Sequence, residues 1–248
     1  MDLSISEKDR YDRQMRVSGW GEEGQKKLKQ SKVVVMGVGG LGCPASLYLG
    51  AAGVGHLVLV DKDSSELSNL NRQILHWQKD IGKPKVLSAK EKILALNPEI
   101  KVEALKTDIT EQNIDKLISG ATVIVDAMDN FEIRYMINEA CVKNKIPFVH
   151  AGIYGFQGQM TTIVPGKSPC LKCIFPVKPP EAERFPVVGV TPGLLGILQA
   201  TEVIKLILGI GEPLIGKLLF FDLEDMTFVT CETRGDSNCP VCKKSRAN

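Results

Sequence analysis

The segment spanning residues 32–61, KVVVMGVGGLGCPASLYLGAAGVGHLVLVD, constrains the fold more than any other part of the chain. Short apolar runs at residues 33–36 and 57–60 have the length and β-branched composition of buried strands. A glycine-rich turn and an apolar helix at residues 41–52 lie between them. Two strands joined through a helix form the basic unit of a parallel sheet, so this segment predicts an α/β protein.

Strand and helix patterns continue to alternate up to about residue 155, which predicts a Rossmann-like, doubly wound and mainly parallel sheet. Beyond that point, GQMTTIVPG and KLLFFDLEDMTFVTCE have the pattern of antiparallel strands that extend the sheet, with an apolar helix at Val190–Leu208 between them. Residues 7–30 have the composition of a polar helical arm ahead of the first strand. Because no repeat or low-complexity linker interrupts the chain, we expect residues 1–248 to form a single domain.

Charge and composition argue against several classes of protein. The 31 basic and 29 acidic residues give a net charge of +2, so we expect no nucleic-acid partner and no membrane partner. The N-terminus lacks the apolar core of a signal peptide, which predicts a cytoplasmic protein whose seven cysteines are thiols or metal ligands. The longest apolar stretch, residues 190–210, contains Gln199, Glu202 and Lys205 and is therefore predicted to be a buried helix.

Four glycines directly after the first strand spell G-x-G-G-x-G: Gly37, Gly39, Gly40 and Gly42. Glycines at such a turn let backbone N–H groups approach a phosphate or a ribose closely. Asp61 lies 24 residues beyond Gly37, at the end of the second strand, where an acid can accept hydrogen bonds from ribose hydroxyls. The pattern predicts a nucleotide site, although a turn that only packs a helix on a strand is the alternative. It does not choose among NAD, FAD and ATP.

The side chains that distinguish these nucleotides are polar or charged and fall after predicted strands or in the arm: Asn69, Arg72, Gln73, Lys85, Asp126, Asp129 and Arg13. Cations gathered at one edge of a sheet suit a triphosphate better than a pyrophosphate beside a nicotinamide. An aspartate at the carboxyl edge can hold Mg²⁺ through its oxygens. Each residue taken singly is equally consistent with a solvated charge, but their joint arrangement predicts MgATP.

Several of these residues fall in longer motifs, which occur in the order RYDRQ, GVGGLG, LVDKDSSELSNLNRQ, GKPK and DAMDN. In this respect the chain resembles the ThiF/MoeB/HesA family, relatives of the adenylation domain of ubiquitin-activating enzymes. The resemblance extends from about residue 10 to the last cysteine pair. It implies an enzyme that binds MgATP and adenylates the C-terminal glycine of a small ubiquitin-like protein. It also implies a helical arm (residues 1–30), a nucleotide-binding half (31–165) and a zinc-knuckle and carrier-docking half (166–248).

The resemblance assigns roles to individual residues of the predicted site. Gly39 and Gly40 would lie beneath the nucleotide, and Asp61 would hold the ribose. Asp129 would bind magnesium, and Arg13 would reach the triphosphate from the partner subunit of a homodimer. The phosphates would be contacted by three residues of the polar loop, Asn69, Arg72 and Lys85. Gln73 of the same loop is also counted among the cofactor-binding residues. A carboxylate that attacks a phosphate is already an anion, so a set of cations with one magnesium ligand suits adenylation without a general base.

Two CxxC pairs, Cys170/Cys173 and Cys239/Cys242, predict a four-thiolate zinc site. The 65 residues between the pairs exceed the spacing of a compact zinc ribbon, so the fold must bring the pairs together. The resemblance supports this interpretation, because many family members have two such pairs. A closed four-cysteine site has no open coordination position and would be structural. Two separate redox motifs are the competing interpretation.

The remaining cysteines are Cys43, Cys141 and Cys231, which we interpret as structural. Some family members have a reactive cysteine in the loop after the first CxxC pair, but here that loop, IFPVKPPEAERFPVVGVTPG, contains none. Chemistry would then stop at the acyl-adenylate, and sulfur would come from a separate donor protein. This departure favours the molybdopterin-type branch of the family over the thiamine-type branch.

The sequence thus predicts ATP-dependent adenylation of a Gly-Gly-ending sulfur carrier, with release of pyrophosphate, for molybdopterin, thiamine or related biosynthesis. The alternative within the superfamily is an enzyme that adenylates another carboxylate, such as the dehydratase of a threonylcarbamoyl-modified tRNA adenosine. An NAD-dependent oxidoreductase and a non-catalytic binding scaffold are the rivals from other classes.

Overall fold

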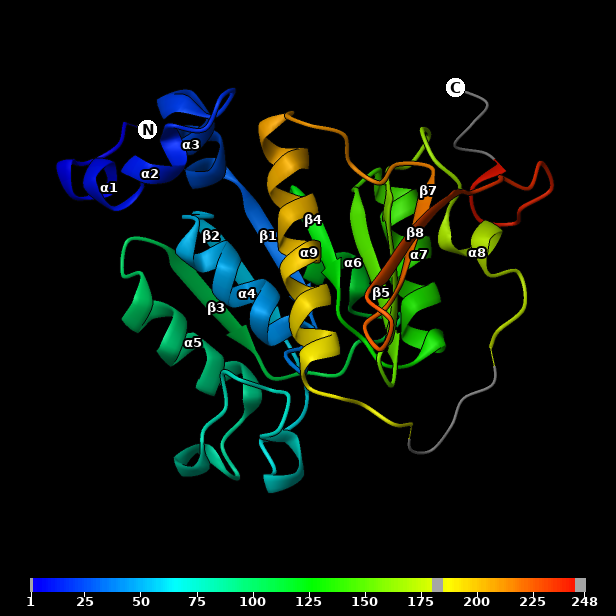
Figure 1. The fold of residues 1–248 in the computed structure, drawn as a ribbon, viewed down its shortest axis with the longest axis horizontal. Helices are drawn as coiled ribbons and strands as arrows, with labels where there is room; N and C mark the ends of the chain where they lie inside the picture. Colours follow the sequence, from blue (N-terminus) through cyan, green and yellow to red (C-terminus); the bar gives the residue numbers. More distant parts are fainter. Residues whose placement is uncertain (1, 180–184, 244–248) are drawn as a thin grey trace.

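The protein forms one eight-stranded sheet in a computed structural model that describes residues 2–179 and 185–243. The strand order is β3-β2-β1-β4-β5-β6-β7-β8 (Figure 1). The five strands β3, β2, β1, β4 and β5 are parallel, and β5 to β8 pair antiparallel. The predicted Rossmann-like sheet with an antiparallel extension is therefore confirmed.

The strands are β1 (Lys32–Met36), β2 (His56–Val60), β3 (Lys101–Leu105), β4 (Val123–Asp126), β5 (Phe148–Tyr154), β6 (Gln157–Ile163), β7 (Lys217–Asp222) and β8 (Thr227–Glu232). The α-helices are α1 (Ile5–Arg10), α2 (Asp12–Met15), α3 (Gly21–Gln30), α4 (Gly42–Ala51), α5 (Lys85–Leu96), α6 (Ile114–Ile118), α7 (Phe131–Asn144), α8 (Leu171–Ile174) and α9 (Val190–Leu208). Two single 3-10 turns, η1 (Leu67–Asn69) and η2 (Gln78–Asp80), lie in the connection between β2 and α5.

Side chains that alternate along the strands divide the core into two layers. In β1, Val33 and Val35 belong to the layer covered by α4, α5 and α9. Val34 and Met36 belong to the opposite layer, which α6 and α7 cover. Because both faces are covered, the central strands are apolar along their whole length, as parallel strands usually are.

The N-terminal segment is helical, as predicted, and it is packed against the body of the protein. Tyr11 is only 3% exposed, and its Oη accepts a hydrogen bond of 2.8 Å from Asn97 Nδ2. Gln14 Nε2 donates to the carbonyl of Ala52, which directly follows α4. Helices α1 to α3 are therefore fixed at the edge of the sheet where the parallel strands begin (Figure 1).

Helix α9 is long and apolar enough to cross a membrane by length and composition alone. It packs instead on β4, β5, β6 and α4, and two of its polar residues, Gln199 and Glu202, are buried and bonded inside the protein. Gln199 Nε2 donates to the carbonyls of Asp126 and Val149, at 2.8 and 3.0 Å. Glu202 accepts hydrogen bonds from Thr162 Oγ1 and from the backbone N–H of Leu214. The side of the helix that packs on the sheet is therefore buried, as predicted, and the rest of the helix is partly or fully exposed.

Candidate nucleotide site and metal centre

The glycine turn between β1 and α4 leaves no room for side chains at two of its positions. Gly37 has φ +91°, and a Cβ there would lie 2.7 Å from the carbonyl oxygen of Ala127. A Cβ on Gly42 would lie only 1.9 Å from the carbonyl oxygen of Gly37. The glycines thus let the chain turn tightly from β1 into α4. They also bring this turn against Ala127, the residue that follows β4.

Asp61, the residue after β2, is bonded to the glycine turn. Its Oδ2 accepts a hydrogen bond of 2.8 Å from the Val38 N–H, and its Oδ1 accepts one of 2.8 Å from the Asp63 N–H. The carboxylate is therefore held at the carboxyl edge of the sheet, beside the first residues of the turn. This position suits the predicted role at a ribose, which remains a prediction.

Asn69 and Gln73 lie in the polar connection and shape it against the turn. Asn69 is buried in η1, where its Oδ1 accepts from the Glu66 N–H and its carbonyl accepts from the Arg72 and Gln73 N–H groups. Gln73 is 5% exposed, and its Nε2 lies 3.5 Å from the place of a Cβ on Gly39. Within the described part of the chain, its Oε1 has no hydrogen-bond partner. Gln73 thus places its amide nitrogen beside the turn, and its amide oxygen is buried without a partner among the residues that the structure describes.

The two predicted phosphate cations of the connection are held by neighbouring oxygens. Arg72 Nη1 donates to the Ser68 carbonyl at 2.9 Å, and its Cγ lies 3.6 Å from the place of a Cβ on Gly40. Lys85 begins α5 and is 7% exposed, with its Nζ 3.0 Å from Asp63 Oδ2. The structure therefore brings Arg72 to the turn and Lys85 to the loop that follows Asp61.

The two aspartates at the end of β4 have different environments, which the sequence did not distinguish. Asp126 is completely buried, and its Oδ2 lies 2.7 Å from His150 Nδ1, so it is not available to a magnesium ion. Burial lowers the pKa of His150, which keeps that ring neutral. Asp129 is exposed, and its Oδ1 accepts a hydrogen bond of 3.4 Å from Asn130 Nδ2. Of the two, only Asp129 has the access that a magnesium ligand requires.

Arg13 lies at the opposite edge of the sheet from these groups. It is exposed on α2, next to Gln14, which is bonded to Ala52 at the end of α4. The glycine turn precedes the same helix, and a ten-residue helix is about 15 Å long. Arg13 and the turn therefore lie at opposite ends of α4 within one chain.

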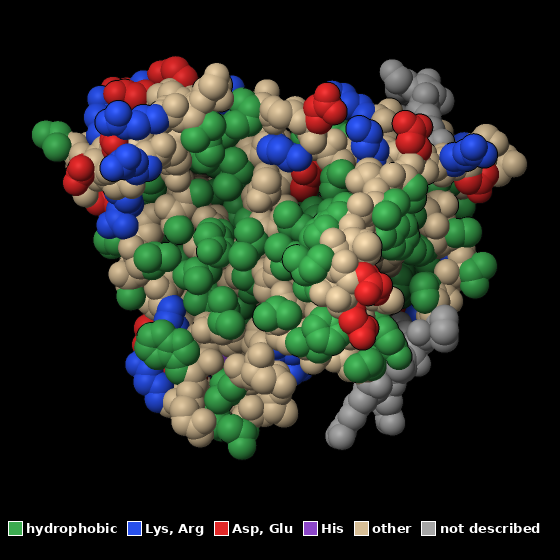
Figure 2. Space-filling view, viewed as in Figure 1, with side chains coloured by type: hydrophobic (Ala, Val, Ile, Leu, Met, Phe, Trp, Pro, Cys, Tyr) green, Lys and Arg blue, Asp and Glu red, His purple; other side chains and the backbone are tan. Residues whose placement is uncertain are grey.

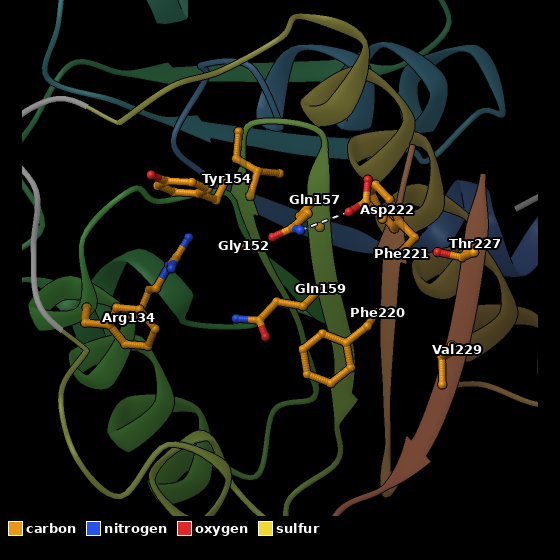
Figure 3. Close-up of a pocket in the computed structure, with 13 residues that line it drawn as sticks. Arg134, Gly152, Tyr154, Gln157, Gln159, Phe220, Phe221, Asp222, Thr227 and Val229 are labelled. Carbon is orange, nitrogen blue, oxygen red and sulfur yellow. Dashed lines mark hydrogen bonds between the residues drawn. The ribbon is translucent and has the colours of Figure 1, made fainter. Parts of the chain in front are cut away.

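Arg134 was not anticipated from the sequence, where it is one of several charged residues of a helix. Its Nη2 donates to the carbonyls of Met128 and Ala151, at 2.6 and 2.9 Å. The same guanidinium lines a pocket of about 470 Å³ between β5, β6 and the β7–β8 hairpin (Figure 3). Arg134 thus connects the pocket with the turn that ends in Asp129.

Both apolar and polar side chains line the pocket. Gly152 on β5 and Gly158 on β6 contribute backbone, and Figure 3 shows Gln159 and Phe220 facing the same space as Arg134. Gln157 Nε2 donates to Asp222 Oδ2 at 2.9 Å at one end. We call this pocket beside the antiparallel strands the slot.

The two CxxC pairs meet in space, as predicted. All four Sγ atoms lie within 4.8 Å of one another, with Cys170 3.6 Å from Cys239 and Cys173 3.4 Å from Cys242. A tetrahedral zinc with Zn–S bonds of about 2.3 Å requires sulfur–sulfur separations of about 3.8 Å. The thiols present therefore fit a closed zinc site that joins α8 to the C-terminal segment.

The other three cysteines differ in exposure. Cys43 is fully buried in α4, and burial raises the pKa of its thiol to about 12. Cys141 is fully buried in α7, where burial also raises the pKa of its thiol. These two are structural, as predicted, whereas Cys231 is exposed on β8. Part of the loop after the first CxxC pair, residues 180–184, lies outside the described residues.

These features define a nucleotide-binding α/β protein with a four-cysteine centre. The chain belongs to the ThiF family, whose model matches residues 11–241. The SAMP-activating enzyme E1 of Haloferax volcanii is 46% identical over 247 residues, covering 98% of this chain and 91% of that protein. The sulfur carrier protein adenylyltransferase of Thermus thermophilus is 43% identical over 247 residues, covering 95% and 91%. A crystal structure of E. coli MccB with ATP is similar with a TM-score of 0.85 at 27% identity, covering 96% of this chain and 75% of that chain.

Proposed function

We propose that the protein uses MgATP to adenylate the C-terminal glycine of a small ubiquitin-like sulfur carrier and releases pyrophosphate. The names of two relatives, a SAMP-activating enzyme and a sulfur carrier protein adenylyltransferase, support this activity. ATP as the nucleotide is supported by the similar structure of MccB with ATP. The product would supply sulfur transfer in molybdopterin, thiamine or related biosynthesis.

The arrangement of the carboxyl edge supports a division of roles within the site. Asp61 would bind the ribose beside the glycine turn, and Arg72 and Lys85 would neutralise the phosphates. Asp129 would hold magnesium, since it is the exposed aspartate of the two at the end of β4. When bound, the ion would offset the charge of the triphosphate and help pyrophosphate to leave.

The observation that most strongly supports a protein substrate is the position of Arg134. Its guanidinium lines the slot beside β6 and also holds the Met128 carbonyl, one residue before Asp129. A flexible Gly-Gly tail in the slot would approach the magnesium ligand from this side. Two glycines also suit a passage whose walls are partly backbone, at Gly152 and Gly158.

The body of a carrier would dock on the antiparallel end of the sheet. All six residues of β8 are exposed, and this strand has no neighbour on its outer side within the described sheet. Phe220, Phe228 and Val229 are exposed there by 42%, 50% and 61%. Exposed apolar side chains around an edge strand are typical of protein interaction sites.

The chemistry requires positioning and charge neutralisation rather than proton transfer. The attacking carboxylate is already an anion at pH 7, so no general base has to activate it. The buried pair of Asp126 and His150 has no exposed surface and so is not accessible to a substrate as an acid–base pair. Cations held in place at the turn are what an in-line attack on the α-phosphate requires.

A homodimer would complete the site. Arg13 is separated from the turn of its own chain by the length of α4, so it would contact the triphosphate bound to a partner subunit. Hydrophobic side chains gather over the middle of the face formed by α4 and α9 (Figure 2). Tyr48 of α4 is 50% exposed on this helix, which suits a surface covered by a second copy.

The zinc site and the buried cysteines complete the proposal. A zinc ion held by Cys170, Cys173, Cys239 and Cys242 would be structural, because four thiolates leave no open position. Since Cys43 and Cys141 are buried thiols with raised pKa values, we expect sulfur to come from a separate donor protein.

ATP–pyrophosphate exchange with purified Gly-Gly-ending carriers tests the proposal. We expect exchange that requires the terminal glycine, and a loss of at least 100-fold in Asp129→Ala and Arg72→Ala. Asp115→Ala is the matched control for the aspartate, because Asp115 is exposed on α6 and pairs with Lys143. Absence of exchange with every carrier, together with tight NAD binding, would contradict the proposal.

A further inference from the structure

A chain of buried polar side chains lies behind the glycine turn and takes no part in the proposed chemistry. Its members come from the polar connection and from α5: His76, Asp80, Ser88 and Lys92. They are 2%, 2%, 0% and 7% exposed. Burying four polar side chains is costly unless they are bonded to one another, so the presence of this buried polar group requires an explanation.

His76 is the member that contacts the turn. Its Nε2 lies 2.9 Å from the Val38 carbonyl oxygen, and its Nδ1 lies 3.1 Å from Ser88 Oγ. Burial lowers the pKa of His76, so the ring is neutral at pH 7 and has one proton. Because a carbonyl only accepts hydrogen bonds, that proton is on Nε2 and is donated to Val38. The Ser88 hydroxyl has a single proton and lies 3.1 Å from both His76 Nδ1 and the Leu75 carbonyl oxygen.

The remaining members hold Ser88 in place beside His76. Lys92 Nζ donates to Ser88 Oγ at 2.9 Å and forms a buried ion pair with Asp80. Although burial opposes ionisation, the hydrogen bond from Lys92 lowers the pKa of Asp80 to about 2. Ser88 Oγ is thus held between Lys92, from which it accepts a hydrogen bond, and the Leu75 carbonyl, to which it donates one.

The bond from His76 orients one peptide group of the turn, whose carbonyl oxygen also accepts a longer hydrogen bond of 3.4 Å from Cys43 Sγ. In a planar trans peptide the C=O and the following N–H point in opposite directions. With the Val38 carbonyl directed at His76, the Gly39 N–H is directed away from the buried chain. Among the described residues, this N–H has no hydrogen-bond acceptor. The preceding N–H, that of Val38, is bonded to Asp61 Oδ2.

We propose that His76 is a positioning residue for the nucleotide: it orients the Val38–Gly39 peptide so that the Gly39 N–H faces the phosphate or ribose. Through the bond between Val38 and Asp61, it also keeps the Asp61 carboxylate in place for the ribose hydroxyls. This inference rests on the proposed function only in taking the nucleotide to be ATP.

The test compares two amides at position 76. In His76→Gln the side-chain N–H can occupy the place of Nε2, whereas in His76→Asn it is one bond too short to reach the Val38 carbonyl. Ile93→Val, at a fully buried site of α5 away from the turn, is a control for loss of stability alone. Exchange rates are measured with ATP and with 2′-deoxy-ATP, over a range of nucleotide and carrier concentrations.

We expect His76→Asn to raise the KM for ATP about tenfold, as the loss of one buried hydrogen bond would. The preference for ATP over 2′-deoxy-ATP should fall at least about threefold, since Asp61 loses its position, while the KM for the carrier stays within about twofold. His76→Gln should restore both nucleotide values. Equal behaviour of the two amides, or the same pattern in Ile93→Val, would overturn the inference.

Direct binding separates this inference from the proposed function. If the wild-type protein catalyses no exchange with any carrier, the proposed function fails, but calorimetry still gives the Kd values for ATP and 2′-deoxy-ATP. A Kd ratio that falls in His76→Asn and recovers in His76→Gln supports the positioning role by itself. An unchanged ratio in both variants refutes it.

Discussion

Replacing Gly42 with alanine tests the geometry of the nucleotide turn, because two physical effects predict opposite signs. Gly42 is the first residue of α4, and alanine is favoured over glycine in helix interiors by about 1 kcal/mol. The new Cβ, however, would lie 1.9 Å from the Gly37 oxygen. That is about 1.4 Å closer than a carbon–oxygen contact of about 3.3 Å allows. The turn must therefore move away from α4.

We expect the clash to outweigh the helix preference. Overpacking of this kind costs about 1–3 kcal/mol, so Gly42→Ala should lower the free energy of unfolding by about 1–2 kcal/mol. A shift of about 1 Å in a binding group can reduce a rate about 100-fold, and we expect a loss of that order in ATP–pyrophosphate exchange. Urea denaturation and exchange kinetics measure the two effects separately.

Gly39→Ala is the matched control in the same turn. Its Cβ would meet Gln73 Nε2 at 3.5 Å, an ordinary contact. We expect its stability to stay within about 0.5 kcal/mol of the wild type, while the KM for ATP rises because backbone next to the nucleotide is covered. A Gly42→Ala protein that is as stable and as active as the wild type would refute the predicted clash between a side chain at position 42 and the Gly37 carbonyl.

Three further predictions concern other parts of the molecule. Because burial lowers the folded-state pKa of His76 and His150, the unfolded chain takes up protons first as the pH falls. The free energy of unfolding should then decrease below about pH 6.5, by up to about 1.4 kcal/mol per pH unit for each histidine; a flat urea-denaturation profile from pH 7.5 to 5.5 would count against this. Cys242→Ser should abolish stoichiometric zinc in elemental analysis and lower the thermal midpoint, and unchanged zinc content would exclude the four-cysteine site. Gly158→Ala would place a Cβ 2.3 Å from Phe221 Cζ, so the ring must shift. The KM for the carrier should rise several-fold with that for ATP unchanged, and equal changes in both would argue against the slot.

The fold was largely predictable because its signals are local. Strand β1 and helix α4 are predicted by an apolar run, a glycine turn and a second apolar run. The strands are apolar throughout because both faces of the sheet are covered. The meeting of Cys170 with Cys239 was also predictable, since two CxxC pairs without other partners suggest a shared metal. These predictions depend on residue type and spacing, both of which the sequence contains directly.

The environment of single side chains was less predictable, because it depends on distant elements. Asp126 and Asp129 both follow the same strand, yet contact with His150 from β5 buries the first, and the second remains exposed. His76 has no ligand spacing in the sequence, since its partners are a backbone carbonyl and a serine twelve residues away. Arg134 can donate to the Ala151 carbonyl because β5 pairs with β4, the strand that precedes α7. Such contacts arise from the topology of the sheet.

The polar bonds of α9 have a consequence for how the nucleotide turn can evolve. Pro192, near the start of α9, lies 3.1 Å from the place of a Cβ on Gly40, whereas Gln199 is bonded to carbonyls of β4 and β5 two turns further along. Apolar contacts alone would allow the helix to slide along the sheet at little cost, but two directional bonds from one amide define its axial position. The seven-residue spacing between Pro192 and Gln199 in α9 therefore fixes where Pro192 meets the glycine turn. An insertion or deletion between Pro192 and Gln199 should be far more damaging than any single apolar substitution there.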